Sequence, residues 1–172
     1  MAFRKRSAAM DIDTDRLPDY RLVADVGNPY EPEGLTRTIL SGSGKLVVEQ
    51  QRAEPGPPEQ GGEAVGGGAD RPEQAKPERP TAARVAGEYD FGVQSAKEMI
   101  VRAADFPWSQ PFPTRPGIPS EPVLEWTLRD ERGPELKVTV WLRDAEKDES
   151  MAPVVAALRH AVERATKGEL FL

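Results

Sequence analysis

The residues from Val123 to Val162 constrain the fold most, because two runs of strand period are followed at once by a run of helical period. Apolar and polar residues alternate over 123–129 and again over 135–142, on either side of the turn sequence Asp-Glu-Arg-Gly-Pro. This pattern predicts a β-hairpin with one apolar face. The predicted apolar face consists of Leu124, Trp126, Leu128, Leu136, Val138, Val140 and Leu142.

A helix is predicted directly after the hairpin and an acidic loop at 144–149. Ser150 is the expected N-cap, Pro153 lies in the first turn, where a missing N–H costs nothing, and Gly168 is the expected stop. The apolar side chains recur at intervals of four and three, which places them on one stripe that should cover the hairpin. The stripe comprises Met151, Val155, Leu158, Val162 and Ala165, widened by Val154 and Ala161.

The rest of the chain adds strands and one more helix. Strands are predicted over 20–26, 35–40 and 45–51, the last two joined by a Ser-Gly-Ser-Gly hairpin turn. Ser95 and Glu98 have capping-box spacing at the start of a short helix. The fold class is therefore α+β, an antiparallel sheet of four to six strands covered by two helices. The predicted core contains Leu22, Val26, Ile39, Leu46, Val48, Ile100, Phe106, Trp126, Leu128, Val138, Val140, Val155, Leu158 and Val162.

The composition divides the chain into one domain and two loose segments. Residues 53–80 hold six prolines, six glycines and no aromatic residue, so they cannot bury enough apolar surface to offset the entropy of ordering. We expect a disordered linker over 53–85, inserted into a single α+β domain formed by 19–52 and 86–172. Residues 1–18 are expected to be a flexible arm, because their Asp11-Asp13-Asp15 spacing does not continue as a calcium loop.

Charge and residue usage exclude several classes of function. A net charge of −6 disfavours nucleic-acid binding, which requires clustered cations. The absence of cysteine excludes disulfides, cysteine nucleophiles and thiolate metal sites. No apolar stretch is long enough for a secretory signal or a membrane span, so a cytoplasmic protein without membrane contact is expected. No cofactor motif is present, and none is expected to bind.

Catalytic groups are sparse. His160 is the only histidine and lies off the apolar stripe, so we expect it to face solvent, and a histidine-based triad within one chain is excluded. Asp144, Glu146, Asp148 and Glu149 place four carboxylates in six residues, which favours a solvated loop over a site for a hard cation. The sequence therefore predicts a protein that is not an enzyme.

Aromatic residues mark the candidate binding residues. Trp141 lies on the hairpin strand face opposite the apolar one, where a tryptophan either anchors a partner or is covered by another segment. Residues 107–122 carry six prolines together with Trp108 and Phe112. These two side chains are expected either to cover Trp141 or to form one partner-binding patch with it.

A family resemblance follows from the pattern of strand, turn, strand, acidic loop and proline-started helix. The upstream helix ends in Ala104-Asp105-Phe106, and over residues 87–165 the chain resembles the emfourin-type inhibitors of thermolysin-like metallopeptidases. The resemblance implies a small cytoplasmic α+β protein that acts by binding, and no inhibitory residue is carried over from it. The segments that carry it are Leu124–Leu128, Gly133, Val138–Val140, Asp144–Glu149 and Ala152–Leu158.

Three functional hypotheses follow. The first is a non-catalytic module that binds another protein, with emfourin-like peptidase inhibition as its most specific form. The second is a small regulatory or assembly subunit of a larger complex, with the linker as a tether. The third is a carboxylate-dependent enzyme or cation binder that uses the acids of residues 144–149.

Overall fold

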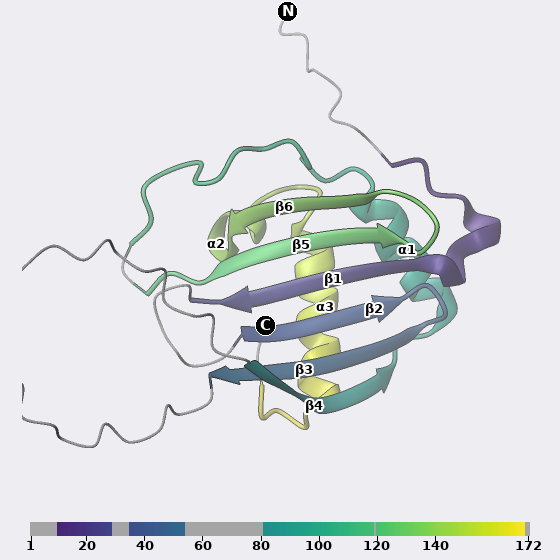
Figure 1. Cartoon of the computed structure of the whole chain (residues 1–172), viewed down its shortest axis with the longest axis horizontal. Helices are drawn as coiled ribbons and strands as arrows, with labels where there is room; N and C mark the ends of the chain where they lie inside the picture. Colours follow the sequence, from purple (N-terminus) through teal and green to yellow (C-terminus); the bar gives the residue numbers. More distant parts are fainter. Residues whose placement is uncertain (1–9, 29–34, 54–80, 119, 171–172) are drawn as a thin grey trace, which may run out of the picture.

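A six-stranded, fully antiparallel sheet forms the framework of the fold (Figure 1). The computed structural model describes residues 10–28, 35–53, 81–118 and 120–170. The strand order is β4-β3-β2-β1-β5-β6, so β1 near the start of the chain pairs with β5 near its end. The strands are β1 (Tyr20–Gly27), β2 (Leu35–Ser41), β3 (Lys45–Ala53), β4 (Thr81–Asp90), β5 (Val123–Asp130) and β6 (Glu135–Trp141).

Helices α1 (Val93–Ala103) and α3 (Ala152–Ala165) lie on the same face of this sheet, which confirms the α+β class (Figure 1). The predicted stripe of α3 is confirmed, because Met151, Val155 and Leu158 are all almost completely buried. The prediction that this stripe mainly covers the β5–β6 hairpin is wrong, because the strands closest to α3 are β4 and β3, at the other edge of the sheet. Two short helices, η1 (Thr14–Asp19) and α2 (Leu142–Ala145), complete the elements of the described residues. None of the helices in the described part of the chain combines the length and the apolar character of a membrane span.

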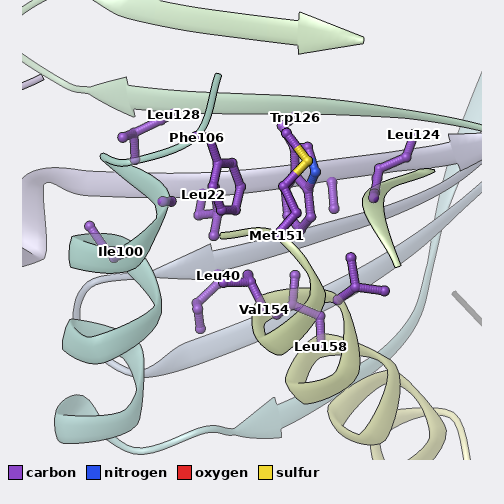
Figure 2. Packing of buried hydrophobic residues seen from close by; sticks show 14 of the residues in the cluster. Leu22, Leu40, Ile100, Phe106, Leu124, Trp126, Leu128, Met151, Val154 and Leu158 are labelled. Carbon is purple, nitrogen blue, oxygen red and sulfur yellow. The ribbon is translucent and has the colours of Figure 1, made fainter. Parts of the chain in front are cut away.

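The core lies between the two longer helices and the sheet, with Trp126 near its centre (Figure 2). The Trp126 ring lies 5.1 Å from the Phe106 ring, and Phe106 lies 5.5 Å from Trp108. Figure 2 shows Met151, Val154 and Leu158 of the α3 segment facing the strand residues. Burial of each such side chain contributes roughly 1.5–3 kcal/mol, so this layer is the main source of stability.

The strand faces follow the sequence pattern with one exception. β1 alternates as predicted, with Tyr20 and Leu22 buried. In β2 the prediction that Ile39 belongs to the core is wrong, because Leu40 is fully buried and Ile39 faces the other side of the sheet. The core face of β2 also carries Thr38, and this polar residue hides the alternation from sequence reasoning.

The folded unit is larger than predicted at two boundaries. The expected arm over 1–18 is wrong for its second half, because Met10 and Leu17 are buried and Asp13 caps the helix η1 by accepting from the N–H of Asp15. The expected linker over 53–85 is wrong at its end, because β4 begins at Thr81 and pairs with β3. The predictions for residues 1–9 and 54–80 lie outside the described residues.

Helix starts also differ from the predictions. The predicted cap at Ser95 is wrong, because α1 begins at Val93 and its N-cap is Gly92, whose φ of 82° suits a residue without a side chain. The predicted cap at Ser150 is wrong as well. The carboxylate of Asp148 accepts from the backbone N–H of Ser150 and of Met151, at 2.9 and 3.0 Å, and so holds the turn before α3. Part of the predicted acidic loop is helical, because α2 extends to Ala145.

Candidate functional site: a braced proline-rich loop

The proline-rich segment 107–122 covers Trp141 at the end of β6. The prediction that Trp141 points away from the core face is confirmed by its register, opposite Val123 of β5. Trp141 is nevertheless only 7% exposed, and the Phe112 ring lies 5.0 Å from its ring. Of the two alternatives for this tryptophan, the structure shows the one in which the loop covers it.

Arg115 joins two parts of this loop to each other and connects the loop to α2. Its guanidinium donates to both carboxylate oxygens of Glu121, through Nη1 at 3.0 Å and through Nη2. It also donates to Asp144 of α2, from Nε at 3.1 Å and from Nη2 at 3.0 Å. A planar guanidinium that binds two carboxylates at once fixes both position and orientation, so Arg115 braces the loop against α2.

The charges of this brace stabilise one another. Hydrogen bonds from Arg115 lower the pKa of Glu121, aided by the backbone N–H of Ile118, and burial opposes this effect. The carboxylates of Glu121 and Asp144 in turn raise the pKa of Arg115. The Glu121 side chain is only 4% exposed, so a carboxylate there needs the arginine to remain charged in the fold.

Trp141 also contacts the loop directly. Its indole Nε1–H donates to the carbonyl of Arg115 at 3.2 Å, and the guanidinium carbon of Arg115 lies 5.7 Å from the ring centroid. Gly117 lies so close that a Cβ atom there would be 2.3 Å from the indole Cη2. The loop is therefore held by contacts with the Trp141 ring as well as by the ion pairs of Arg115.

Replacing Gly117 by alanine is expected to displace the loop from the Trp141 ring. An added Cβ at 2.3 Å from a ring carbon cannot be accommodated without movement, and overpacking of this kind costs roughly 1–3 kcal/mol. Urea denaturation and tryptophan fluorescence measure the effect. In a Trp141→Val background the clash is absent, so Gly117→Ala should be close to neutral there. Equal losses in both backgrounds would contradict the contact.

The braced loop presents two apolar side chains to solvent. Phe112 is 39% exposed and Ile118 is 60% exposed. Beside Ile118, a shallow hollow of about 400 Å³ is lined by Pro122, Leu142 and the charged Arg143. Ser120 adopts a φ of 66°, a conformation that costs a residue with a side chain on the order of 1 kcal/mol or more and that tends to occur at functional sites.

The three predicted partner-binding residues have different surroundings. Trp108 is only 7% exposed, belongs to the core and donates from Nε1 to the carbonyl of Ala103 at 3.0 Å. It is therefore a core residue, and its prediction as a contact residue is wrong in this structure. Trp141 is covered by the loop, and Phe112 is the member of the three that reaches solvent.

Sequence reasoning missed the residues that brace the loop. Arg115 lies 29 positions before Asp144, and nothing in the local pattern links them. The only available signal is a lone arginine within a run of prolines, which is a weak one. Glu121 was missed for the same reason, since its burial depends on a loop path that the sequence does not encode as periodicity.

Three of the four acidic side chains at 144–149 bind different partners and so do not form one site. Asp144 binds Arg115, Asp148 accepts from backbone N–H groups, and Glu146 forms an ion pair with Arg159. Within the described part of the chain, no group of three or more acidic or histidine side chains is placed to hold a metal ion. His160 is exposed, as predicted, and accepts from Arg164 Nε at 3.1 Å.

No family model matches the chain, and no curated protein matches it.

Proposed function

We propose that this protein is a non-catalytic module that binds another protein through the braced loop. The observation that carries the proposal is that Arg115 binds both Glu121 and Asp144 in a loop that also carries two exposed apolar side chains. A loop already held in one conformation loses less entropy on binding, so its apolar contacts contribute more to affinity. Aromatic residues are common anchors in such interfaces.

The most specific form of this proposal is inhibition of a thermolysin-like metallopeptidase in the cytoplasm. The emfourin resemblance over residues 87–165 motivates it, and this range includes the whole braced loop. A stiff loop with outward Phe112 and Ile118 has the shape and chemistry to enter an apolar cleft of a peptidase. Protein, not nucleic acid, is the proposed partner, because the net charge is −6.

An inhibition titration tests the specific form. Increasing amounts of the protein are added to a thermolysin-like peptidase, and hydrolysis of a small peptide substrate is followed. We expect the wild-type chain to reduce hydrolysis, and we expect Phe112→Asp to weaken the inhibition by about 30-fold, since loss of an anchor costs roughly 2 kcal/mol or more. Undiminished hydrolysis at a large excess of wild-type protein would remove the peptidase inhibitor form.

A matched control separates the loop from apolar surface in general. Val93 is 59% exposed at the start of α1, so Val93→Asp makes the same kind of change outside the loop and should leave inhibition unchanged. If Val93→Asp and Phe112→Asp weaken inhibition equally, the loop is not the contact element. The broader proposal is tested by affinity capture from lysate, in which a protein retained by wild type must be lost with Phe112→Asp combined with Ile118→Asp.

A further inference from the structure

The face of the sheet opposite α1 and α3 has a distinct pattern of side chains. Within the described residues, no helix or strand covers its central part (Figure 1). A shallow hollow of about 360 Å³ lies over β1, β2, β5 and β6, and its floor includes Val23, Ile39 and Thr127. We call this surface the open face. At one edge of this face, the braced loop lies over Trp141 of β6, which points to the same side of the sheet.

A row of uncharged residues crosses the centre of the open face. Val23 is opposite both Ile39 of β2 and Thr127 of β5, and Ile39 is opposite Val47 of β3. The register therefore aligns four side chains across four neighbouring strands. The three aliphatic members are half-buried, and charged residues flank the row on either side. This central row is the apolar part of the open face.

The charged residues beside the central row are arranged by sign in an unusual way. On one side Arg21 is directly opposite Arg129, and on the other side Asp25 is directly opposite Glu125. Like charges in directly opposed positions destabilise a strand pair, so two such pairs between the same two strands break a local rule. Violations of this kind occur where a surface has a role beyond the stability of its own fold.

The fold neutralises only half of these charges. Arg37 binds Asp25 through two hydrogen bonds of 2.7 and 3.0 Å, and Arg21 binds Glu131 at 2.7 Å. Among the described residues, neither Arg129 nor Glu125 forms an ion pair, although the hydroxyl of Thr139 lies 3.5 Å from Glu125. One cation and one anion on β5 thus stay available to a partner.

The same order of charges recurs along three strands. β1 has Arg21, Val23 and Asp25 on the open face, and β3 has Lys45, Val47 and Glu49. β5 runs in the opposite direction and has Glu125, Thr127 and Arg129, which places its cation beside that of β1. One side of the central row is therefore mainly positive and the other mainly negative. Glu135 and Arg37 are exceptions, and they are paired with Lys137 and Asp25. At the β4 edge, Asp90 is a further exception opposite Lys45, which forms an ion pair with Glu88.

We propose that the open face binds a second copy of this chain in a symmetric, face-to-face dimer. If a two-fold axis runs along the central row, each uncharged residue faces the same residue of the other copy. The positive side of one copy then faces the negative side of the other. Arg129 of one copy then faces Glu125 of the other, and Arg21 faces Asp25. An isologous interface requires such a self-complementary surface, and the order of charges along β1, β3 and β5 provides it.

The size of the open face indicates a dimer of modest affinity. Six strands at about 4.8 Å spacing and about seven residues of 3.3 Å each give a footprint of roughly 25 by 23 Å. This area is at the lower end of specific interfaces, and much of it is charged. We therefore expect dimerisation at concentrations on the order of 10–100 µM, weakening as salt screens the exposed pairs.

Sedimentation velocity of the full chain at about 200 µM in low salt tests the proposal. We expect the mass of a dimer for wild type. We expect Arg129→Glu and Glu125→Arg each to raise the dissociation constant about hundredfold, because symmetry places each like-charge contact twice in the interface. The double variant exchanges the two charges and is expected to restore the dimer, a result that a local folding defect would not produce.

Lys147→Glu serves as the control for Arg129→Glu, since it makes the same change in net charge on the exposed turn after α2 and should dimerise as wild type does. A wild-type chain that stays monomeric at 200 µM overturns the proposal. So does a dimer that persists in both single variants, because it uses another surface. A double variant that is folded by circular dichroism but monomeric also overturns it. Peptidase inhibition by the loop is measured separately and does not depend on this result.

Discussion

Replacing Trp126 by alanine is expected to lower the free energy of unfolding by about 3–5 kcal/mol. Trp126 is completely buried, lies opposite the small Ala24 of β1 and has its ring 5.1 Å from Phe106. Alanine would leave a cavity between the sheet and both longer helices, and a packed interior closes such a cavity only in part. Urea denaturation followed by circular dichroism measures the change.

A phenylalanine variant isolates the polar part of the indole. The buried Nε1–H of Trp126 has no hydrogen-bond acceptor among the described residues, so removing it deprives the fold of no described bond. Trp126→Phe should therefore cost less than about 1.5 kcal/mol, from lost volume alone. If Trp126→Phe lowers the free energy of unfolding as much as the alanine variant does, the indole N–H has a hydrogen-bond partner in solution. An alanine variant within 1 kcal/mol of wild type would contradict the central position of Trp126.

Periodicity explains why so much of this core could be predicted from the sequence. Leu124, Trp126 and Leu128 alternate with polar residues, and this alternation alone determines which face of β5 is buried. The stripe of α3 is similarly determined by intervals of three and four residues. Both features depend only on neighbours in the sequence, so no knowledge of the fold is needed to identify them.

The errors occur where the local pattern is ambiguous or absent. Thr38 occupies a core position in β2, so Ile39 is the more apolar choice although it faces the open side. The start of β4 at Thr81 carries no alternation strong enough to distinguish it from the proline-rich segment before it. Pairing with β3 places this strand in the sheet, and such tertiary pairing overrides weak β propensity.

The sequence indicates where the candidate site lies, but it does not indicate which side chains hold the loop in place. The prolines and aromatic residues of 107–122 indicate an ordered loop near Trp141, and the structure shows that contact. The brace could not be inferred, because Arg115, Glu121 and Asp144 come together only when α2 follows β6 directly. Ion pairs between distant segments have no periodic signature, so only coordinates reveal which of many arginines and acids are partners.

Replacing Arg115 by alanine is expected to loosen the loop without unfolding the domain. The change removes every hydrogen bond between Arg115 and the carboxylates of Glu121 and Asp144, and leaves the largely buried Glu121 without its cation. We expect amide exchange over 109–118 to accelerate on the order of tenfold, while exchange in β1 and β5 changes little. Inhibition or partner capture should weaken in parallel, since the preorganisation of Phe112 is lost.

Two variants show whether the geometry of Arg115 matters as well as its charge. Arg115→Lys keeps the charge and cannot bind two carboxylates in one plane, so loop exchange should be intermediate. Arg132 is 74% exposed and lies 3.6 Å from Asp19, a surface pair of the kind that contributes little. Arg132→Ala should therefore behave as wild type. Equal acceleration in Arg115→Ala and Arg132→Ala would show that the loop is held by other contacts.

Acid should reproduce the effect of Arg115→Ala in the wild-type protein. Arg115 lowers the pKa of Glu121 from its ordinary value of 4.5, so the charged form is favoured in the fold. The contribution of Glu121 to loop order is therefore complete above pH 4.5 and is lost as the pH falls through the lowered pKa. Fluorescence of Trp141, compared with a Trp141→Phe variant, should report loop release below pH 4.5 in wild type. Arg115→Ala lacks the interaction that titrates, so a release step of unchanged size and midpoint in that variant would assign the acid sensitivity to another carboxylate.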